Sequence, residues 1–293
     1  MSRLSVEVAL NIPTILGEGP VWSTQEGVLY WLDIFKPTIN RFDPRTGAND
    51  VKSVPEPIYA MGLRRGGGFV AGLESGFATI DRPVQSIAYL CNPNVGDDVN
   101  FNDGKVDRQG RFWSGTMARD WESPIGRLFR LDRDCNAHAV DEGMVLSNGL
   151  GWSPDDRRMY FTDFKKSTIY CYDFDAETGD IGNRRPLIAF GDGDGLPDGM
   201  TVDAEGHLWV AHWDGWCVTR HDPDGAEVLR VSVPVPRPTS VAFGGDKLDI
   251  LYVTSATMHL TETQLAEAPL SGALFSVETD VVGLPEPCFE PTD

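Results

Sequence analysis

The sequence predicts an all-β fold, a six-bladed β-propeller with four short strands in each blade. Two observations carry this prediction: one strand opening recurs six times at spacings of 41, 44, 45, 50 and 41 residues, and helical text is nearly absent. A period in the forties with several short strands per unit is typical of propeller blades. The six openings are Gly19-Pro20-Val21-Trp22, Ala60-Met61-Gly62-Leu63, Gly104-Lys105-Val106-Asp107, Gly149-Leu150-Gly151-Trp152, Gly199-Met200-Thr201-Val202 and Ser240-Val241-Ala242-Phe243.

Each opening is followed by a turn and then by an aromatic-rich strand. Runs 27–33, 158–163 and 206–211 read as such second strands, and Asp, Pro and Gly clusters between the runs have hairpin chemistry. Gly66-Gly67-Gly68 is interpreted as one of these hairpin turns. Because propeller blades do not fold singly, we expect one propeller domain over residues 1–293.

Four segments stand outside the repeat. Residues 261–268 predict a short helix with Thr261 as its N-cap. Residues 5–10 alternate as a strand, and we expect them to complete the last blade after residue 284 and so close the ring. Segments 120–126 and 191–199 are long connections, interpreted either as the rim of a pocket or as plain loops between blades.

The charge, the N-terminal residues and the cysteines indicate which binding partners and which cellular compartment to expect. The formal net charge is −19, from 25 basic and 44 acidic residues, which argues against nucleic acid and anionic membranes as partners and indicates a soluble surface. The first seven residues lack the apolar segment of a signal peptide, so the prediction is a cytoplasmic protein. The five cysteines are widely spaced and are expected to be free thiols; Cys171 and Cys217 are interpreted as packing residues.

Oxygen side chains precede the opening in four blades. Glu18, Asn148 and Asp198 stand directly before the opening glycine, and the third blade has Asn102-Asp103. Equivalent positions of propeller blades face one central channel, so these side chains should converge on the axis. Carboxylate and amide oxygens suit a divalent cation. Four protein oxygens leave coordination positions for water or substrate, as in catalytic metal sites.

Each of these short motifs alone has the sequence of an ordinary turn. Only their common position before the blade openings favours a cation site. His212 is interpreted as a packed residue of a second strand in preference to a residue of the channel mouth. The absence of a Gly-x-Ser-x-Gly elbow argues against acyl-enzyme chemistry, and no phosphate-binding glycine loop is present.

The chain resembles the senescence-marker-protein, gluconolactonase and regucalcin family over essentially its full length. The matching segments are 16–22 (Leu-Gly-Glu-Gly-Pro-Val-Trp), 101–107 with 110–117, 147–155 and 197–206. The resemblance implies a central divalent metal held by Glu18, Asn148 and Asp198, with calcium, zinc, manganese or iron serving in different members. It further implies hydrolysis of a sugar-derived lactone to the aldonic acid, with Asp198 also the proposed general base.

The resemblance also suggests substrate contacts. Asn102 is expected to reach the metal directly or through water and to touch the substrate. Animal members carry Arg at the position of Asn100, so a neutral sugar lactone is expected here, with Asn100, Asn102 and Asp120 meeting its hydroxyls. Two other functions stay open: a phosphotriesterase-like hydrolase, for which Trp121, Trp213 and Trp216 would supply an apolar rim, and a non-catalytic calcium-binding regulator.

Overall fold

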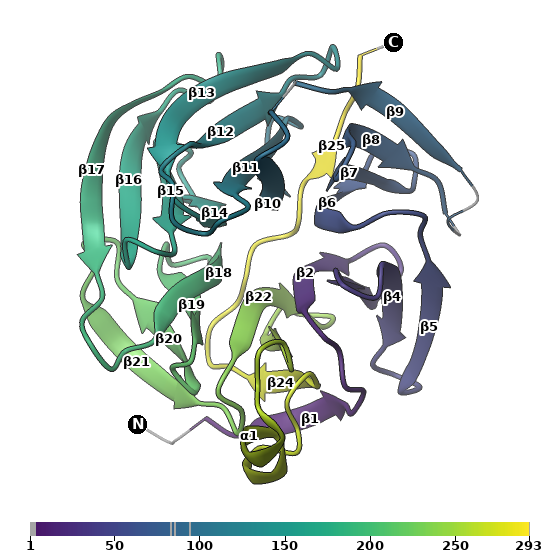
Figure 1. Ribbon diagram of the computed structural model, residues 1–293, viewed down its shortest axis with the longest axis vertical. Coiled ribbons are helices and arrows are strands. Elements are labelled where there is room, and N and C mark those ends of the chain that lie inside the picture. The colour runs from purple at the N-terminus through teal and green to yellow at the C-terminus, as the bar shows by residue number, and fades with distance from the viewer. Residues whose placement is uncertain (1–3, 83, 85, 94, 293) are drawn as a thin grey trace.

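Six β-sheets are arranged as blades around one axis (Figure 1). The structure, a computed structural model, describes residues 4–82, 84, 86–93 and 95–292. The predicted six-bladed propeller is confirmed, and the predicted openings lie on the innermost strands of their blades, except that Asp107 directly follows β10. Five sheets have four strands, and the second blade has a fifth strand that comes from the C-terminal segment.

The blades follow one another along the chain, each running from its innermost to its outermost strand. The first three blades consist of β2 (Gly17–Ser23), β3 (Val28–Asp33), β4 (Thr38–Asp43) and β5 (Ala48–Ser53); β6 (Ile58–Arg64), β7 (Phe69–Leu73), β8 (Gly76–Ile80) and β9 (Ile87–Cys91); and β10 (Val99–Val106), β11 (Phe112–Ala118), β12 (Gly126–Leu131) and β13 (Ala137–Met144). The next two consist of β14 (Ser147–Trp152), β15 (Arg158–Asp163), β16 (Thr168–Phe174) and β17 (Ile181–Ala189); and β18 (Leu196–Val202), β19 (Leu208–Trp213), β20 (Cys217–His221) and β21 (Glu227–Ser232).

The sixth blade closes the ring with a strand from the other end of the chain. It consists of β22 (Pro238–Gly244), β23 (Ile250–Ser255), β24 (Leu274–Glu278) and, outermost, β1 (Val6–Leu10). β1 and β24 pair antiparallel, with Val6 opposite Val277. The predicted closure by the N-terminal strand is confirmed, but its predicted place after residue 284 is wrong, because the partner strand already ends at Glu278.

The residues after β24 cross the axis instead of joining the last blade, as Figure 1 shows. Val282 accepts a hydrogen bond from the Ala204 N–H (2.9 Å), and the Gly283 N–H donates to the Leu248 carbonyl (2.7 Å). The chain then reaches the second blade, where β25 (Cys288–Phe289) pairs parallel with β6. This C-terminal segment, residues 281–290, covers one end of the channel, and the sequence analysis missed it.

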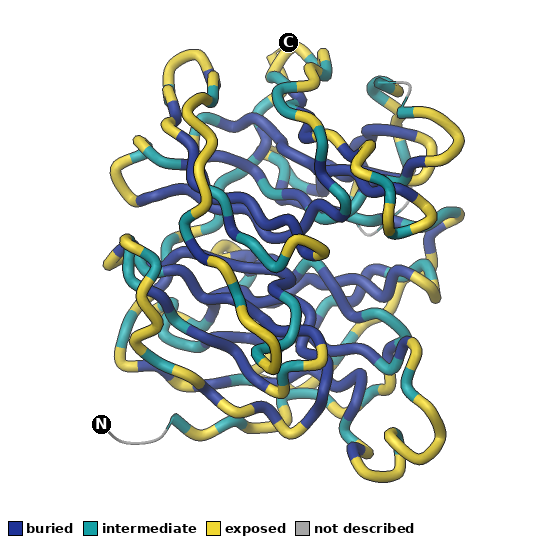
Figure 2. Tube along the Cα trace, turned by 60° about the vertical axis from the view of Figure 1, so that its left-hand side comes forward, coloured by how far each residue is buried: buried dark blue, intermediate teal, exposed yellow. Residues whose placement is uncertain are grey.

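Burial decreases from the inner strands to the outer ones (Figure 2). All residues of β3, β14 and β19 are buried, whereas β5 and β17 are largely exposed. The cores are apolar clusters between neighbouring blades, and Trp31, Trp113 and Trp209 are among the largest fully buried side chains. Because the inner strands are packed on both faces, the repeated segments consist largely of apolar and aromatic residues.

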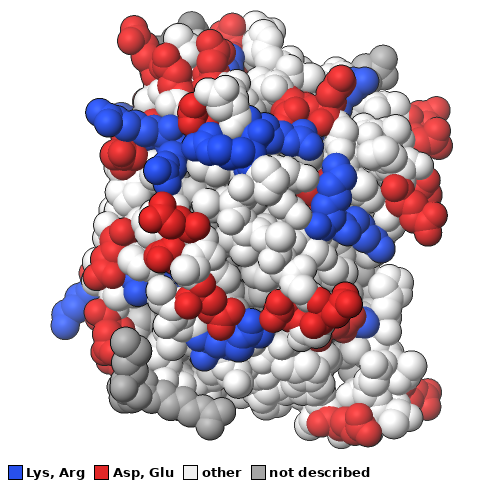
Figure 3. Space-filling model, turned by 90° about the vertical axis from the view of Figure 1, so that its left-hand side faces the viewer, with Lys and Arg blue, Asp and Glu red and all other residues white. Residues whose placement is uncertain are grey.

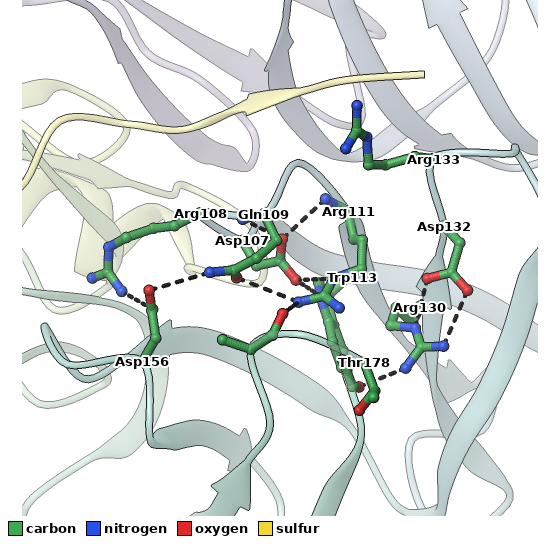
Figure 4. A network of polar contacts seen from close by, with 12 residues as sticks. Asp107, Arg108, Gln109, Arg111, Trp113, Arg130, Asp132, Arg133, Asp156 and Thr178 are labelled. Carbon is green, nitrogen blue, oxygen red and sulfur yellow. Dashed lines mark hydrogen bonds and ion pairs between the residues drawn. The ribbon is translucent and has the colours of Figure 1, made fainter. Parts of the chain in front are cut away.

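A buried carboxylate holds the far end of the third blade together (Figure 4). Asp107 follows β10 and accepts hydrogen bonds from Trp113 Nε1 (2.8 Å) and Arg111 Nε (2.6 Å). Arg111 in turn donates to the Ala176 carbonyl (2.9 Å) of the fourth blade. Asp203 repeats this arrangement in the fifth blade, where it accepts from Trp209 Nε1 (2.9 Å).

The predicted helix, glycine turn and free cysteines are found in the structure. α1 (Glu262–Glu267) begins after an N-cap at Thr261, which exchanges hydrogen bonds with Gln264, as predicted. Gly66-Gly67-Gly68 forms the turn between β6 and β7. Cys91, Cys135, Cys171, Cys217 and Cys288 are free, and Cys171 and Cys217 are buried, as expected.

Acidic and basic side chains alternate on the outer surface around β17 and β21 (Figure 3). Arg184 pairs with Asp141 (3.1 Å), Arg185 with Asp173 (2.9 Å) and Arg230 with Glu227 (2.7 Å). The exposed positions therefore carry paired charges on this side. No helix in the described part of the chain has the length and apolar character needed to cross a membrane.

Candidate metal centre and substrate pocket

Every innermost strand is irregular at the same place, beside the opening residue of its repeat. The register with the second strand shifts between Glu18 and Val21 in the first blade, and at the matching place in the other five. A β-bulge turns the bulged strand and re-aims the side chain beside it. The common register noticed in the sequence is therefore a common bulge, beside which Glu18, Asn148 and Asp198 line the channel pocket.

The glycine of the opening has two local functions. Its N–H satisfies an oxygen of the preceding side chain: Gly19 donates to Glu18 Oε2 (3.1 Å), and Gly149 donates to Asn148 Oδ1 (3.2 Å). Glycine also lets neighbouring inner strands approach, since a Cβ at Gly149 would lie 2.7 Å from the Asp198 carbonyl oxygen. The opening residues thus orient the oxygen side chains and pack the blades closely around them.

Glu18, Asn148 and Asp198 meet at the bottom of one pocket. They are 9%, 4% and 3% exposed and come from β2, β14 and β18. The pocket measures about 640 Å³ including its open mouth. Its remaining lining residues are Leu16, Ile34, Phe35, Tyr59, Asn100, Asn102, Met117, Trp121, Leu146, Phe164, Trp213 and Met258.

No Lys or Arg is among the residues that line the pocket, and the acids at and beside its bottom have raised pKa values. Burial raises the pKa of Glu18 to about 8, and the nearby Asp103 carboxylate adds to this effect. Burial and then the charges of Glu18 and Asp103 raise the pKa of Asp198 well above its ordinary value. The pKa of Asp103 itself is raised to about 6 by burial, against the opposing effect of Lys105. Such a cluster of buried acids favours the binding of positive charge.

The free lone pairs at this place fit a hard cation. Asp198 Oδ1 is buried and has no hydrogen-bond partner among the described residues. No three His, Cys, Asp or Glu side chains in the described part of the chain are grouped closely enough to hold a metal by themselves. A cation here would therefore depend on the Asn148 amide beside the carboxylates of Glu18 and Asp198, an all-oxygen set of the kind that hard divalent ions accept.

The residues predicted to contact substrate lie at different places. Asn100 and Asn102 line the pocket from β10; Asn102 Nδ2 donates to the Ser147 carbonyl (2.7 Å), and Asn100 Oδ1 is buried without a partner among the described residues. Asp120 lies in the exposed loop after β11, where it accepts hydrogen bonds from Ser123 Oγ (2.5 Å) and from the Glu122 N–H (2.9 Å). Those hydrogen bonds lower the pKa of Asp120 to about 2.

His212 is a packed residue of a second strand, as the sequence analysis favoured. It is fully buried in β19, and its Nε2 shares a hydrogen bond with Thr219 Oγ1 (2.6 Å). Of the two long connections, 120–126 contributes Trp121 to the pocket, and 191–199 contributes Asp198 at the beginning of β18. Trp213 also lines the pocket, whereas Trp216 is 46% exposed and is not among the lining residues.

The sequence analysis recognised the residues around the site only in part. Asp103 occupies the strict position before the opening glycine of the third blade, and its Oδ1 accepts from the Gly104 N–H (2.6 Å). The sequence analysis named it together with Asn102, and of the two it is Asn102 that lines the pocket. An apolar group lies at or shortly after the end of the second strand in five blades: Phe35, Trp121, Phe164, Trp213 and Met258. Trp121 and Trp213 were considered for an apolar rim in the sequence analysis, whereas Phe35, Phe164 and Met258 were missed.

Comparisons with known proteins agree with the fold and the motifs. Residues 16–257 match the family described as "SMP-30/Gluconolactonase/LRE-like region". The chain is 40% identical over 287 residues to a 6-deoxy-6-sulfogluconolactonase of Pseudomonas putida, covering 97% of this chain and 98% of that protein. It is 40% identical over 275 residues to a pentonolactonase of Haloferax volcanii, covering 92% and 93%. A crystal structure of a calcium-binding protein, regucalcin, from Agrobacterium tumefaciens superimposes with a TM-score of 0.93 at 27% identity, covering 98% of each chain.

Proposed function

Because the chain belongs to the SMP-30/gluconolactonase/LRE-like family, we propose that it is a cytoplasmic, metal-dependent lactonase that hydrolyses a sugar-derived lactone to the aldonic acid. The observation that carries the proposal is the convergence of Glu18, Asn148 and Asp198 at the bottom of an open pocket. Two relatives named as lactonases, each 40% identical to this chain, support the reaction class.

The three axial residues are proposed to hold one divalent cation, whose identity among calcium, zinc, manganese and iron stays open. When bound, such an ion would polarise a carbonyl oxygen and lower the pKa of a nearby water. Glu18 and Asp198 would balance its charge, and Asn148 would supply a neutral oxygen. The free Oδ1 of Asp198 supports this assignment, because a buried acceptor without a partner is costly unless it is used.

Asp198 is also proposed as the general base. Hydrolysis adds the hydroxyl of water to the carbonyl carbon, breaks the ring carbon–oxygen bond and leaves a proton on the new alcohol. Asp198 would accept the proton of the attacking water at its carboxylate and return it to the leaving oxygen. Asn100 and Asn102 line the same pocket and would hydrogen-bond hydroxyls beside the lactone carbonyl.

The proposal is tested with chelated protein to which calcium, zinc, manganese or ferrous iron is returned separately. Acid release from pentonolactones and hexonolactones is then followed with a pH indicator. Wild-type protein should recover activity with at least one cation, and Asp198→Ala should lose both turnover and cation affinity. Asp246→Ala removes an exposed carboxylate from the turn between β22 and β23 and is the matched control.

Two results would count against this function. Cation binding by the wild type without hydrolysis of any lactone would favour the non-catalytic calcium-binding alternative. Hydrolysis by Asp198→Ala at the rate of Asp246→Ala would remove Asp198 from both of its proposed roles.

A further inference from the structure

The pocket has a polar floor and an apolar wall. The polar residues of the floor are all on innermost strands: Glu18, Asn100, Asn102, Asn148 and Asp198. The upper part of the apolar wall lies at or after the second strands of five blades and consists of Phe35, Trp121, Phe164, Trp213 and Met258. Loops that follow the second strands therefore bound the mouth, and the longest of them are residues 119–125 and 256–273.

These two longest loops meet over the mouth of the pocket. The ring of Trp121 packs edge-on against the ring of His259, with centroids 6.1 Å apart and an interplanar angle of 73°. Trp121 belongs to the third blade and His259 to the sixth. The innermost strands contact one another in chain order around the ring, so these two blades lie on opposite sides of the axis (Figure 1). The contact between the two rings, here called the bridge, therefore passes over the channel.

Backbone hydrogen bonds hold both ends of the bridge. Trp121 has a left-handed backbone (φ 62°), and its N–H donates to the Ala118 carbonyl (3.0 Å). At the other end, the Met258 N–H donates to the Ile15 carbonyl (2.9 Å). The Lys165 ammonium of the fourth blade also lies 6.0 Å from the centre of the Trp121 ring. The bridge is thus formed before a ligand binds.

The bridge divides the mouth into a covered half and an open half. On the side of the fourth and fifth blades, Phe164 and Trp213 are only 4% and 8% exposed. The Arg237 guanidinium lies 4.6 Å from the centre of the Trp213 ring. On the other side, Phe35 of the first blade is 53% exposed. The way into the pocket is therefore beside Phe35.

We infer that Trp121 and His259 are specificity-determining residues that restrict the pocket to lactones of a single sugar. This inference rests on the proposed lactonase function, which brings the ester carbonyl to the cation site at the floor. The pocket, about 640 Å³ including its mouth, has room for one pentose or hexose ring below the bridge. A second sugar joined to that ring has to displace the bridge or leave through the half of the mouth beside Phe35. Such an obstacle discriminates against the larger ligand without improving contacts to the smaller one.

The test compares lactones with and without a second sugar on the same ring. Two such pairs are D-glucono-1,5-lactone against cellobiono-1,5-lactone, and D-xylono-1,5-lactone against xylobiono-1,5-lactone. The reacting ester is the same within each pair. For wild-type protein, kcat/KM should be about tenfold or more higher for the single-sugar member. Equal values, or a preference for the disaccharide lactones, would overturn the inference.

Removing either end of the bridge should reduce this preference. Trp121 and His259 both have left-handed backbones (φ 62° and 59°), which glycine adopts without strain, so Trp121→Gly and His259→Gly should fold. In each variant the preference should fall about fivefold or more, through faster turnover of the disaccharide lactone. Trp216→Gly is the matched control, because Trp216 has the same backbone conformation (φ 57°) in the turn between β19 and β20 but does not line the pocket. An unchanged preference in both bridge variants would contradict the inference.

His259→Phe separates a steric bridge from imidazole chemistry. Phenylalanine keeps a ring opposite Trp121 but has no ring nitrogen to donate or accept a proton. This variant should retain the preference of the wild type for single-sugar lactones. If His259→Phe loses the preference as His259→Gly does, the effect comes from the imidazole and the steric inference falls.

The bridge and the lactonase function can fail separately. If the wild type hydrolyses a single-sugar lactone but shows no preference over its disaccharide partner, the lactonase function stands and the bridge has no part in specificity. If no lactone of the set is hydrolysed with any of the four cations, the proposed function falls and the inference with it.

Discussion

The two ends of the central channel are built from the same inner strands but treat buried acids in opposite ways. Asp103 lies within β10, close enough to Glu18 and Asp198 for its charge to act on them, and Asp107 directly follows the C-terminal end of the same strand. Asp107 is neutralised by Arg111 and hydrogen-bonded by Trp113, and the C-terminal segment 281–290 covers that end of the channel. Glu18 and Asp198 line the open pocket; the charge of Asp103 adds to the burial that raises the pKa of both, and Glu18 also raises the pKa of Asp198.

This difference separates acids that support the structure from acids suited to a reaction. A buried carboxylate with its own arginine and a tryptophan N–H is complete and gains nothing from a ligand. A group of acids without a local cation is incomplete until it binds one. The predictions below test whether the covered end supplies stability while the open end supplies chemistry.

The largest effect on stability is expected from the covered end. Phe289→Ala removes a fully buried ring from β25, where it packs in the core between the second and third blades. The free energy of unfolding should fall by about 3–5 kcal/mol, and Tm by roughly 6–15 °C. Thermal unfolding followed by circular dichroism measures this change. Val282→Ala, an exposed position in the same segment, is the control, and the folded Phe289→Ala protein should keep its kcat/KM.

At the open end, we expect a large loss of activity without a loss of stability. Glu18→Gln keeps the side-chain shape but removes one of the crowded charges, so we expect a loss of roughly 100-fold or more in turnover. In a chelator the variant should be at least as stable as the wild type, because fewer buried charges repel one another. Adding the activating cation should raise the Tm of the wild type and leave that of Glu18→Gln nearly unchanged. An equal rise in both proteins would exclude Glu18 as a ligand.

A smaller effect is expected behind the open end, at His212. Burial lowers the pKa of His212 to about 4, with the charge of Arg230 as the next cause. Because the histidine of the unfolded chain becomes protonated near pH 6.5, the stability that neutral His212 contributes is complete above that pH and is lost as the pH falls through 4. Relative to His212→Gln, the wild type should lose about 2 kcal/mol between pH 6.5 and 4.5. Urea unfolding of both proteins at several pH values measures the difference.

The smallest effect concerns the choice among lactones. Asn100→Ala removes a buried amide whose Oδ1 has no partner among the described residues. Loss of one hydrogen bond to a neutral hydroxyl costs about 1 kcal/mol, which is several-fold in kcat/KM. The ranking of lactones that differ at one ring hydroxyl should change while cation affinity is retained. A uniform fall on every lactone, or a large loss of cation affinity, would place Asn100 in the cation site instead.

The repeat predicted the propeller and its inner strands because the bulge imposes the same small residues on every blade. The same regularity identified Glu18, Asn148 and Asp198. Asn102 and Asp103 are adjacent oxygen residues; a bulge decides which of two such neighbours faces inward, and here Asn102 lines the pocket. A sequence motif does not show which of the two residues faces inward, because this depends on the register with the partner strand.

The C-terminal segment could not be recognised from its pattern. Residues 281–290 do not alternate between apolar and polar side chains and do not continue the repeat. Prolines at 285 and 287 also interrupt any strand-like pattern. Their place is set by contacts with distant inner strands, such as the parallel pairing of Phe289 with Arg64. The apolar wall was seen only in part for a related reason, because its members come from five blades and only the three-dimensional ring brings them together.

The pairing of β1 with β24 joins residues that are almost a whole chain apart, with Val6 opposite Val277. During synthesis the first strand therefore waits for its partner until the ribosome has made the chain through β24. Until then the growing chain carries open strand edges, which are sites for pairing with other chains. Closure over such a sequence distance also carries a large entropic cost, so the ring is expected to form late and slowly. Assembly of this enzyme would thus depend on chaperones that bind exposed edges more than that of a protein with local contacts.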